Sequence, residues 1–124
     1  HRTIHLAAAP PKENAAHILE RFESAFVNRN LAEKGVAPAG LRRKFWSIQN
    51  DVLGQLLKEH GVDLLMPPEN TLTSTGFLRP DCYAADATHA NPKYGLQLLE
   101  QVVAYAKAAM PSVGAPNVLS SKGS

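Results

Sequence analysis

The chain has 124 residues, of which 44% are hydrophobic and 19% are charged, and its formal net charge is +2. This composition is typical of one globular domain with its own core, and so small a charge argues against nucleic-acid binding. The single cysteine, Cys82, excludes an internal disulfide and a cysteine-based zinc site. The apolar runs are too short to predict a membrane span, and oxidising and reducing compartments both remain open.

Residues 3–9 predict a short buried strand that ends at two consecutive prolines. We interpret His5, which lies in this strand, as a packed structural residue. Residues 12–33 follow with apolar side chains at helical spacing, so they predict an amphipathic helix. Its polar residues, His17 and Glu20 among them, are expected to be solvated.

Residues 41–60 show the clearest helical period in the chain, and they predict a helix that Gly61 ends. The apolar stripe of this helix consists of Leu41, Phe45, Ile48, Val52, Leu53, Leu56 and Leu57. Two polar groups within it, Arg42-Arg43-Lys44 and Asn50-Asp51, are interpreted as solvated. Residues 62–66 predict a second short strand, and residues 69–85 predict a long, turn-rich loop.

A third helix is predicted over residues 92–110, with Asn91 as its N-cap and Pro92 at its first helical position. Its predicted buried stripe consists of Gly95, Leu98, Leu99, Val102, Val103 and Ala106. Residues 111–124 are rich in Pro, Gly, Ser and Asn, and they predict a disordered tail.

The predicted order is strand, helix, helix, strand, long loop, helix, which favours an α/β fold with two short parallel strands and three helices. In such sheets functional groups gather beyond the carboxyl ends of the strands. Both pairs of prolines and the loop at Asp86–His89 follow strand ends, so we expect them to share one edge of the sheet.

Asp86 and His89 lie three residues apart, just before the third helix. A carboxylate beside an imidazole can hold the imidazole in one tautomer while the ring acts as a general base. The plainer alternative is a solvated loop in which Asp86 binds backbone amides. A metal site of His89 with His5 or His60 is a weaker interpretation, because no two of these histidines have ligand spacing on one element. The sequence therefore implies no metal and no cofactor.

Residues 62–105 resemble the C-terminal part of the SGNH (GDSL-like) hydrolase superfamily. The resemblance consists of Val-Asp-Leu-Leu-Met-Pro-Pro at 62–68, Gly-Phe-Leu at 76–78 and Asp-Ala-Thr-His-Ala-Asn-Pro-Lys-Tyr-Gly at 86–95. It implies that Asp86 and His89 are the acid and the base of a Ser-His-Asp triad. It also implies a partial three-layer, flavodoxin-like fold, in which residues 1–110 form the C-terminal portion of an SGNH-like domain.

The chain departs from this family where the nucleophile should be. The Gly-Asp-Ser block and the oxyanion-hole glycine and asparagine are absent, and Ser24, Ser47 and Ser74 lack the context of that nucleophile. Asn50-Asp51 matches the family's Asn-Asp pair in letters only, because it follows a helix.

We therefore expect a C-terminal segment of an ester hydrolase whose serine lies outside this chain, and an isolated chain that is inactive. The expected substrate is a small-molecule ester or an O-acylated compound, and the expected partner is the missing N-terminal part or a second copy. One alternative is a non-catalytic α/β module that binds a ligand or a partner. Another is an unrelated helical α/β interaction domain.

Overall fold

A computed structural model describes residues 1–21 and 30–110. The elements are β1 (Ile4–Leu6), α1 (Ala15–Glu20), α3 (Leu31–Lys34), α4 (Ala39–Glu59), β2 (Asp63–Leu65) and α5 (Pro92–Ala109), with single 3₁₀ turns at Glu69–Thr71 and Pro80–Cys82. The tail predicted at 111–124 lies outside the described residues. None of the helices within the described ranges has the length and apolar character needed to cross a membrane.

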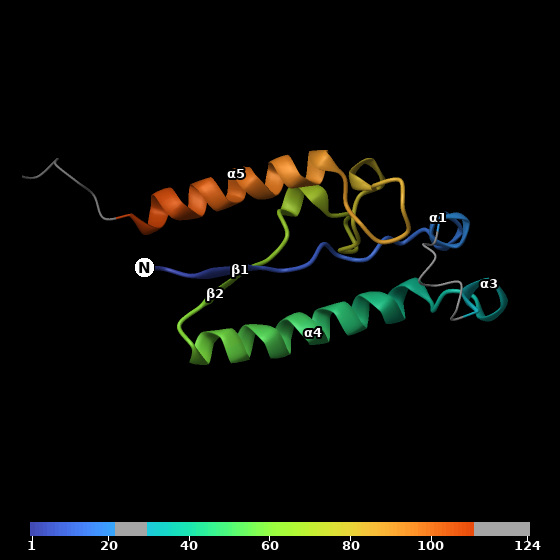
Figure 1. Cartoon of the computed structure of the whole chain (residues 1–124), viewed down its shortest axis with the longest axis horizontal. Helices are drawn as coiled ribbons and strands as arrows, with labels where there is room; N and C mark the ends of the chain where they lie inside the picture. Colours follow the sequence, from blue (N-terminus) through green and yellow to red (C-terminus); the bar gives the residue numbers. More distant parts are fainter. Residues whose placement is uncertain (22–29, 111–124) are drawn as a thin grey trace, which may run out of the picture.

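The sheet consists of β1 and β2, which run parallel and pair Ile4 with Asp63, His5 with Leu64 and Leu6 with Leu65. It lies between α5 and α4, so the molecule has three layers (Figure 1). Both strands point toward the long loop that joins β2 to α5. The predicted parallel α/β arrangement is confirmed at this level of detail.

The segment after β1 is extended, whereas a helix was predicted to begin at Lys12. Lys12 forms a parallel bridge with Leu78 of the long loop, and α1 begins only at Ala15. Asn14 caps α1 because its side chain accepts a hydrogen bond from the backbone N–H of His17 at 3.1 Å. The middle of the predicted helix, residues 22–29, lies outside the described residues.

Helix α4 contacts the sheet through a face that the sequence pattern did not indicate. Trp46 donates its indole N–H to the carbonyl of Ala8 at 3.1 Å, and the buried Asn50 donates to the carbonyl of Trp46 at 2.9 Å. Gly54 lies against the side chain of Leu64. The expectation that Asn50 is solvated is therefore wrong, because it lies on the face of α4 that packs on the sheet.

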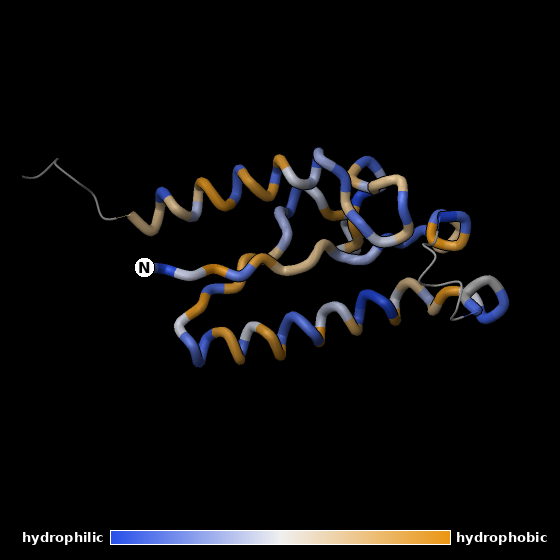
Figure 2. The backbone as a smooth tube through the Cα atoms, viewed as in Figure 1, coloured by the Kyte–Doolittle hydropathy of each residue, from blue (hydrophilic) through white to orange (hydrophobic). Residues whose placement is uncertain are grey.

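Most of the predicted apolar stripe of α4 is exposed instead. The exposed members are Leu41, Phe45, Ile48, Val52 and Leu56. Figure 2 shows how hydrophobic and hydrophilic residues alternate along both long helices. Two strands form too narrow a sheet to cover a second flank of a 21-residue helix. The helical period therefore predicted the helix correctly, but not the face that the helix buries.

Helix α5 begins as predicted, with Asn91 accepting the backbone N–H of Tyr94 at 3.2 Å and Pro92 in the first turn. Its predicted buried stripe is only partly buried. Leu98 is half-buried, whereas Leu99 and Val103 are exposed. These two residues share a flank of α5 that no described residue covers, which parallels the finding for α4.

Leu78, Cys82 and Tyr94 form a buried cluster beyond the carboxyl ends of the strands, and Leu78 is fully buried. Ala7 and Leu65, at the ends of the two strands, are buried as well. β1 itself is largely exposed, and His5 is exposed rather than packed as predicted. The reason is that, among the described residues, β1 has a neighbouring strand on one edge only.

Candidate functional site

The loop that carries Asp86 and His89 is closed at its base by main-chain hydrogen bonds. Ala84 N–H donates to the carbonyl of His89 at 3.0 Å, and Asn91 N–H donates to the carbonyl of Cys82 at 2.8 Å. These bonds bring the two ends of a six-residue loop together directly before α5. The loop therefore has a defined shape even though much of its surface faces solvent.

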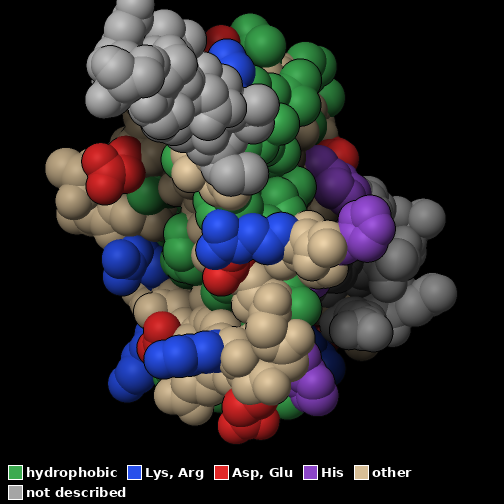
Figure 3. All heavy atoms as spheres, turned by 90° about the vertical axis from the view of Figure 1, so that its left-hand side faces the viewer, with side chains coloured by type: hydrophobic (Ala, Val, Ile, Leu, Met, Phe, Trp, Pro, Cys, Tyr) green, Lys and Arg blue, Asp and Glu red, His purple; other side chains and the backbone are tan. Residues whose placement is uncertain are grey.

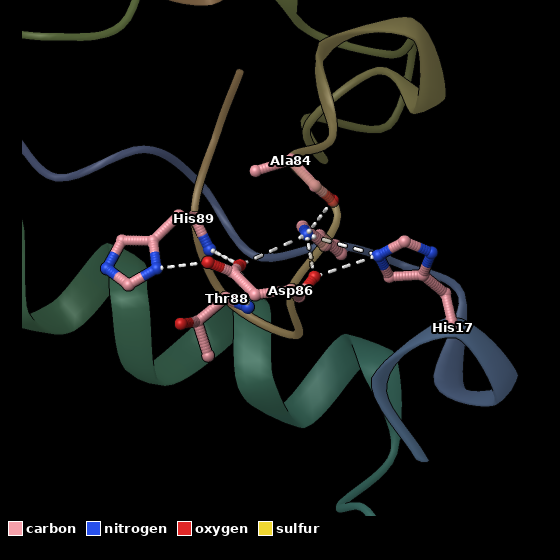
Figure 4. Close-up of polar contacts among 6 residues, drawn as sticks. His17, Ala84, Asp86, Thr88 and His89 are labelled. Carbon is pink, nitrogen blue, oxygen red and sulfur yellow. Dashed lines mark hydrogen bonds and ion pairs between the residues drawn. The ribbon is translucent and has the colours of Figure 1, made fainter. Parts of the chain in front are cut away.

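Asp86 organises the interior of this loop. Its Oδ1 accepts the backbone N–H of Thr88 at 3.1 Å and that of His89 at 2.7 Å, which is an Asx turn. Its Oδ2 lies 2.7 Å from Nδ1 of His89 (Figure 4). The contact predicted between these side chains is present, while their catalytic role stays a prediction.

The electrostatics favour an ionised Asp86. The backbone N–H of His89 lowers the pKa of Asp86; desolvation opposes this shift, and further hydrogen bonds from the His89 ring and from Thr88 N–H add to it. A carboxylate that accepts a hydrogen bond from Nδ1–H fixes the neutral imidazole in its Nδ1–H tautomer. The basic Nε2 then lies on the far edge of a side chain that is 70% exposed.

Lys12 lies beneath the loop, and the sequence did not single it out. The residue is 2% exposed, and its ammonium donates to the carbonyl of Asp86 at 2.6 Å and to that of Ala84 at 3.2 Å. His17 reaches the same place, with Nε2 2.9 Å from the Asp86 carbonyl and 3.2 Å from the Lys12 nitrogen. The expectation that His17 is solvated is wrong, since its ring is half-buried here (Figure 4). The available signal was the place of Lys12, directly after the prolines at a strand end.

Arg42 of α4 holds the main chain at Lys12 and Glu13. Its guanidinium donates to the carbonyls of Lys12 and Glu13, the latter at 3.1 Å, and its Nε donates to that of Ala37 at 2.9 Å. Arg42 was expected on the solvent face of its helix, and that expectation is wrong. The segment that follows β1 is thus fastened to α4 on one side and to the Asp86 loop on the other.

Asp81 fastens the far side of the loop to the start of α5. Its carboxylate accepts hydrogen bonds from Lys93 and Arg79, which lower the pKa of Asp81 to about 2. Its carbonyl accepts the side-chain N–H of Asn91 at 2.8 Å. The N-cap residue of α5 is therefore tied to the turn that precedes the Asp86 loop.

The other residues considered from the sequence do not join Asp86 and His89. Ser47 lies in α4 and Ser74 in the loop after β2, and neither is hydrogen-bonded to His89 within the described part of the chain; Ser24 lies outside it. His60 follows α4 at the opposite end of the molecule (Figure 1). In residues 1–21 and 30–110, no three His, Cys, Asp or Glu side chains group closely enough to hold a metal ion.

The described residues thus form a small α/β unit with an Asp–His pair beyond the carboxyl ends of its parallel strands. Comparison with protein-family models, with curated proteins and with solved structures found no match. The geometry of this pair and its surroundings is therefore the basis of the functional proposal.

Proposed function

We propose that this chain supplies the histidine and the aspartate of a Ser-His-Asp site that hydrolyses esters, in an SGNH-like domain whose serine lies outside the chain. The observation that carries the proposal is the 2.7 Å contact between Asp86 Oδ2 and His89 Nδ1. In this role His89 Nε2 removes the proton of the attacking serine and later donates it to the leaving group. Asp86 orients the ring and stabilises the imidazolium that forms.

The division of hydrogen bonds on Asp86 supports this role. Backbone N–H groups occupy Oδ1, so the carboxylate is held in place without using the oxygen that faces the imidazole. The low pKa of Asp86, caused first by the His89 backbone N–H, keeps it charged at neutral pH. A solvated Asp that merely shaped its own turn would need only the first of these two sets of contacts.

The surface on the β1 side supports the proposal that further α/β structure completes the sheet there. Residues of α5 and β1, including Ile4, Val102 and Met110, line an apolar groove of about 290 Å³. Figure 3 views the molecule from the end where the strands begin, and hydrophobic side chains extend over that end. On α4, Asn50, Gly54 and Lys58 line the groove beside β2, whereas the exposed residues Phe45, Val52 and Leu56 lie outside that groove.

A strand added beside β1 would pack against the apolar groove that α5 forms with Ile4 of β1. Such an addition would widen the two-stranded sheet toward the flavodoxin-like sheet of the SGNH type. It would also bring new strand ends to the edge at which Asp86 and His89 lie, where a nucleophile has to be placed. The proposed substrate is a small ester or an O-acylated compound, since the triad chemistry acts on acyl groups.

The test is esterase activity toward short p-nitrophenyl esters in the complete natural protein that contains this chain. His89→Ala there should lower kcat/KM by about 10² to 10⁴, the usual contribution of a general base, whereas His60→Ala should leave it unchanged. The 124-residue chain alone should not exceed the rate of free imidazole. A fluorophosphonate probe, which labels activated serines, should modify the complete protein and leave this chain unlabelled.

Two results would contradict the proposal. Turnover that survives His89→Ala would exclude His89 as the base. His89-dependent turnover by the isolated chain would place the nucleophile within it, with Ser74 the first candidate. A complete protein that binds an ester without cleaving it would instead favour the non-catalytic binding module.

A further inference from the structure

Lys12 is the least expected charged group in the described part of the chain. Its side chain is 1% exposed, although lysine is among the residues least often buried. Burial lowers the pKa of Lys12, and the nearby charge of Asp86 partly opposes that shift. A buried ammonium is costly unless its donors are satisfied, so its surroundings indicate what it does.

Two carbonyls accept hydrogen bonds from the Lys12 ammonium, that of Asp86 at 2.6 Å and that of Ala84 at 3.2 Å. Nε2 of His17 lies 3.2 Å from the ammonium and 2.9 Å from the same Asp86 carbonyl, so it either accepts from Lys12 or donates to Asp86, but not both at once. The ring of Tyr83 adds a cation–π contact, with the ammonium 5.0 Å from its centroid.

These contacts bind the main chain of the loop rather than its exposed side chains. Ala84 and Asp86 are held by their carbonyls, and Oδ1 of Asp86 lies 3.9 Å from the same ammonium. Lys12 therefore fixes the position of the Asp86 backbone and favours the charge on its carboxylate. Neither effect needs Lys12 to reach a substrate.

We infer that Lys12, together with His17, is a positioning residue that holds the Asp86–His89 pair in its reactive geometry. This inference rests on the proposed hydrolytic function, because it assigns Lys12 a role in the same site. It predicts that removal of the ammonium weakens the contact between Asp86 and His89 without unfolding the rest of the molecule. The control is Lys44→Met, since Lys44 is an exposed lysine on α4.

The first measurement uses the ¹⁵N-labelled 124-residue chain and needs no enzymatic activity. The Lys12 ammonium should exchange slowly with water and show couplings across hydrogen bonds to the carbonyl carbons of Ala84 and Asp86. The ¹⁵N shifts of His89 should report the Nδ1–H tautomer. In Lys12→Met that tautomer preference should be lost while the amide spectra of α4 and α5 persist, and in Lys44→Met nothing should change.

The second measurement is kinetic and uses the complete natural protein. Lys12→Met should lower kcat by about 10 to 100-fold with KM within about twofold, because the substrate still binds while the base is misplaced. Lys12→Arg keeps the charge and donors, and it should recover part of the loss. A merely structural lysine would lower the fraction of folded protein and leave kcat per active site unchanged.

The outcomes separate this inference from the proposed function. A folded Lys12→Met that keeps the His89 tautomer overturns the inference, whether or not the protein is an esterase. If Lys12→Met does not fold, the wild-type chain provides the test. The absence of couplings between the Lys12 ammonium and the carbonyl carbons of Ala84 and Asp86 would then overturn the inference. Loss of the His89 tautomer in a protein without esterase activity supports the positioning role and refutes only the hydrolytic function.

Discussion

Replacement of Gly76 by alanine should destabilise the molecule more than replacement of Gly61, another loop glycine. Gly76 has a φ of +85°, a region that costs an L-residue about 1 kcal/mol or more. An added Cβ would also lie 2.5 Å from Nη2 and 2.9 Å from Cζ of Arg43 on α4. These atoms are the far end of a flexible side chain, so Arg43 can turn away at a further cost of about 0.5 to 1 kcal/mol.

Gly61 provides the matched control. Its φ of +68° carries the same backbone strain, but nothing lies within 4 Å of an added Cβ. We expect Gly61→Ala to cost about 1 kcal/mol and Gly76→Ala about 1.5 to 2 kcal/mol. For a chain of this size the difference corresponds to a fall in Tm of about 2 to 4 °C. Urea unfolding followed by circular dichroism, with both variants at one protein concentration, measures it.

A double-mutant cycle tests the assigned cause. If Arg43 is the obstacle, then Arg43→Ala should remove the excess cost of Gly76→Ala and bring it to the level of Gly61→Ala, with a coupling of about 0.5 to 1 kcal/mol. Equal destabilisation by Gly76→Ala and Gly61→Ala would refute the close approach. Strict additivity in the cycle would refute the role of Arg43.

Two further predictions concern charge and association. Asp81 has a folded pKa of about 2 against about 3.9 in an unfolded chain, so its contribution to stability is complete above pH 4 and is lost as the pH falls toward 2. Asp81→Asn should flatten that part of the pH–stability curve; a curve that keeps the wild-type shape would contradict the assignment. The isolated chain should self-associate through its exposed apolar flanks, and Phe45→Lys or Leu99→Lys should weaken this association in light scattering more than Gln49→Lys does. A compact, cooperatively folding monomer at high concentration would defeat that expectation.

The sequence predicted what depends on neighbouring residues. The N-cap at Asn91, the C-terminal glycine of α4 at Gly61 and both long helices follow from local patterns, and the structure contains them. The contact between Asp86 and His89 is local as well, because the two residues lie three positions apart and an Asx turn joins them.

The sequence did not predict what depends on partners far along the chain. Lys12 meets the Asp86 loop across 74 positions, and Arg42 meets Lys12 across 30. The local sequence around each residue predicts a solvated side chain, because polar character alone says nothing about a hydrogen bond to a distant carbonyl. The prediction that the apolar stripes of α4 and α5 are buried was only partly correct, for a related reason. Periodicity identifies a face that suits burial, and the described residues provide no structure to bury it.

These two classes of contact have different tasks at the site. The Asx turn and the N-cap bring His89 next to Asp86 within six residues. Lys12 and Arg42 fix where that pair lies relative to the sheet, because they join it to β1 and α4. A nucleophile carried by structure that pairs with β1 would be positioned from the same strand. Under the proposed function, the strand that would accept this structure and the lysine that holds the Asp–His pair are therefore parts of one continuous segment, which links the docking surface directly to the catalytic groups.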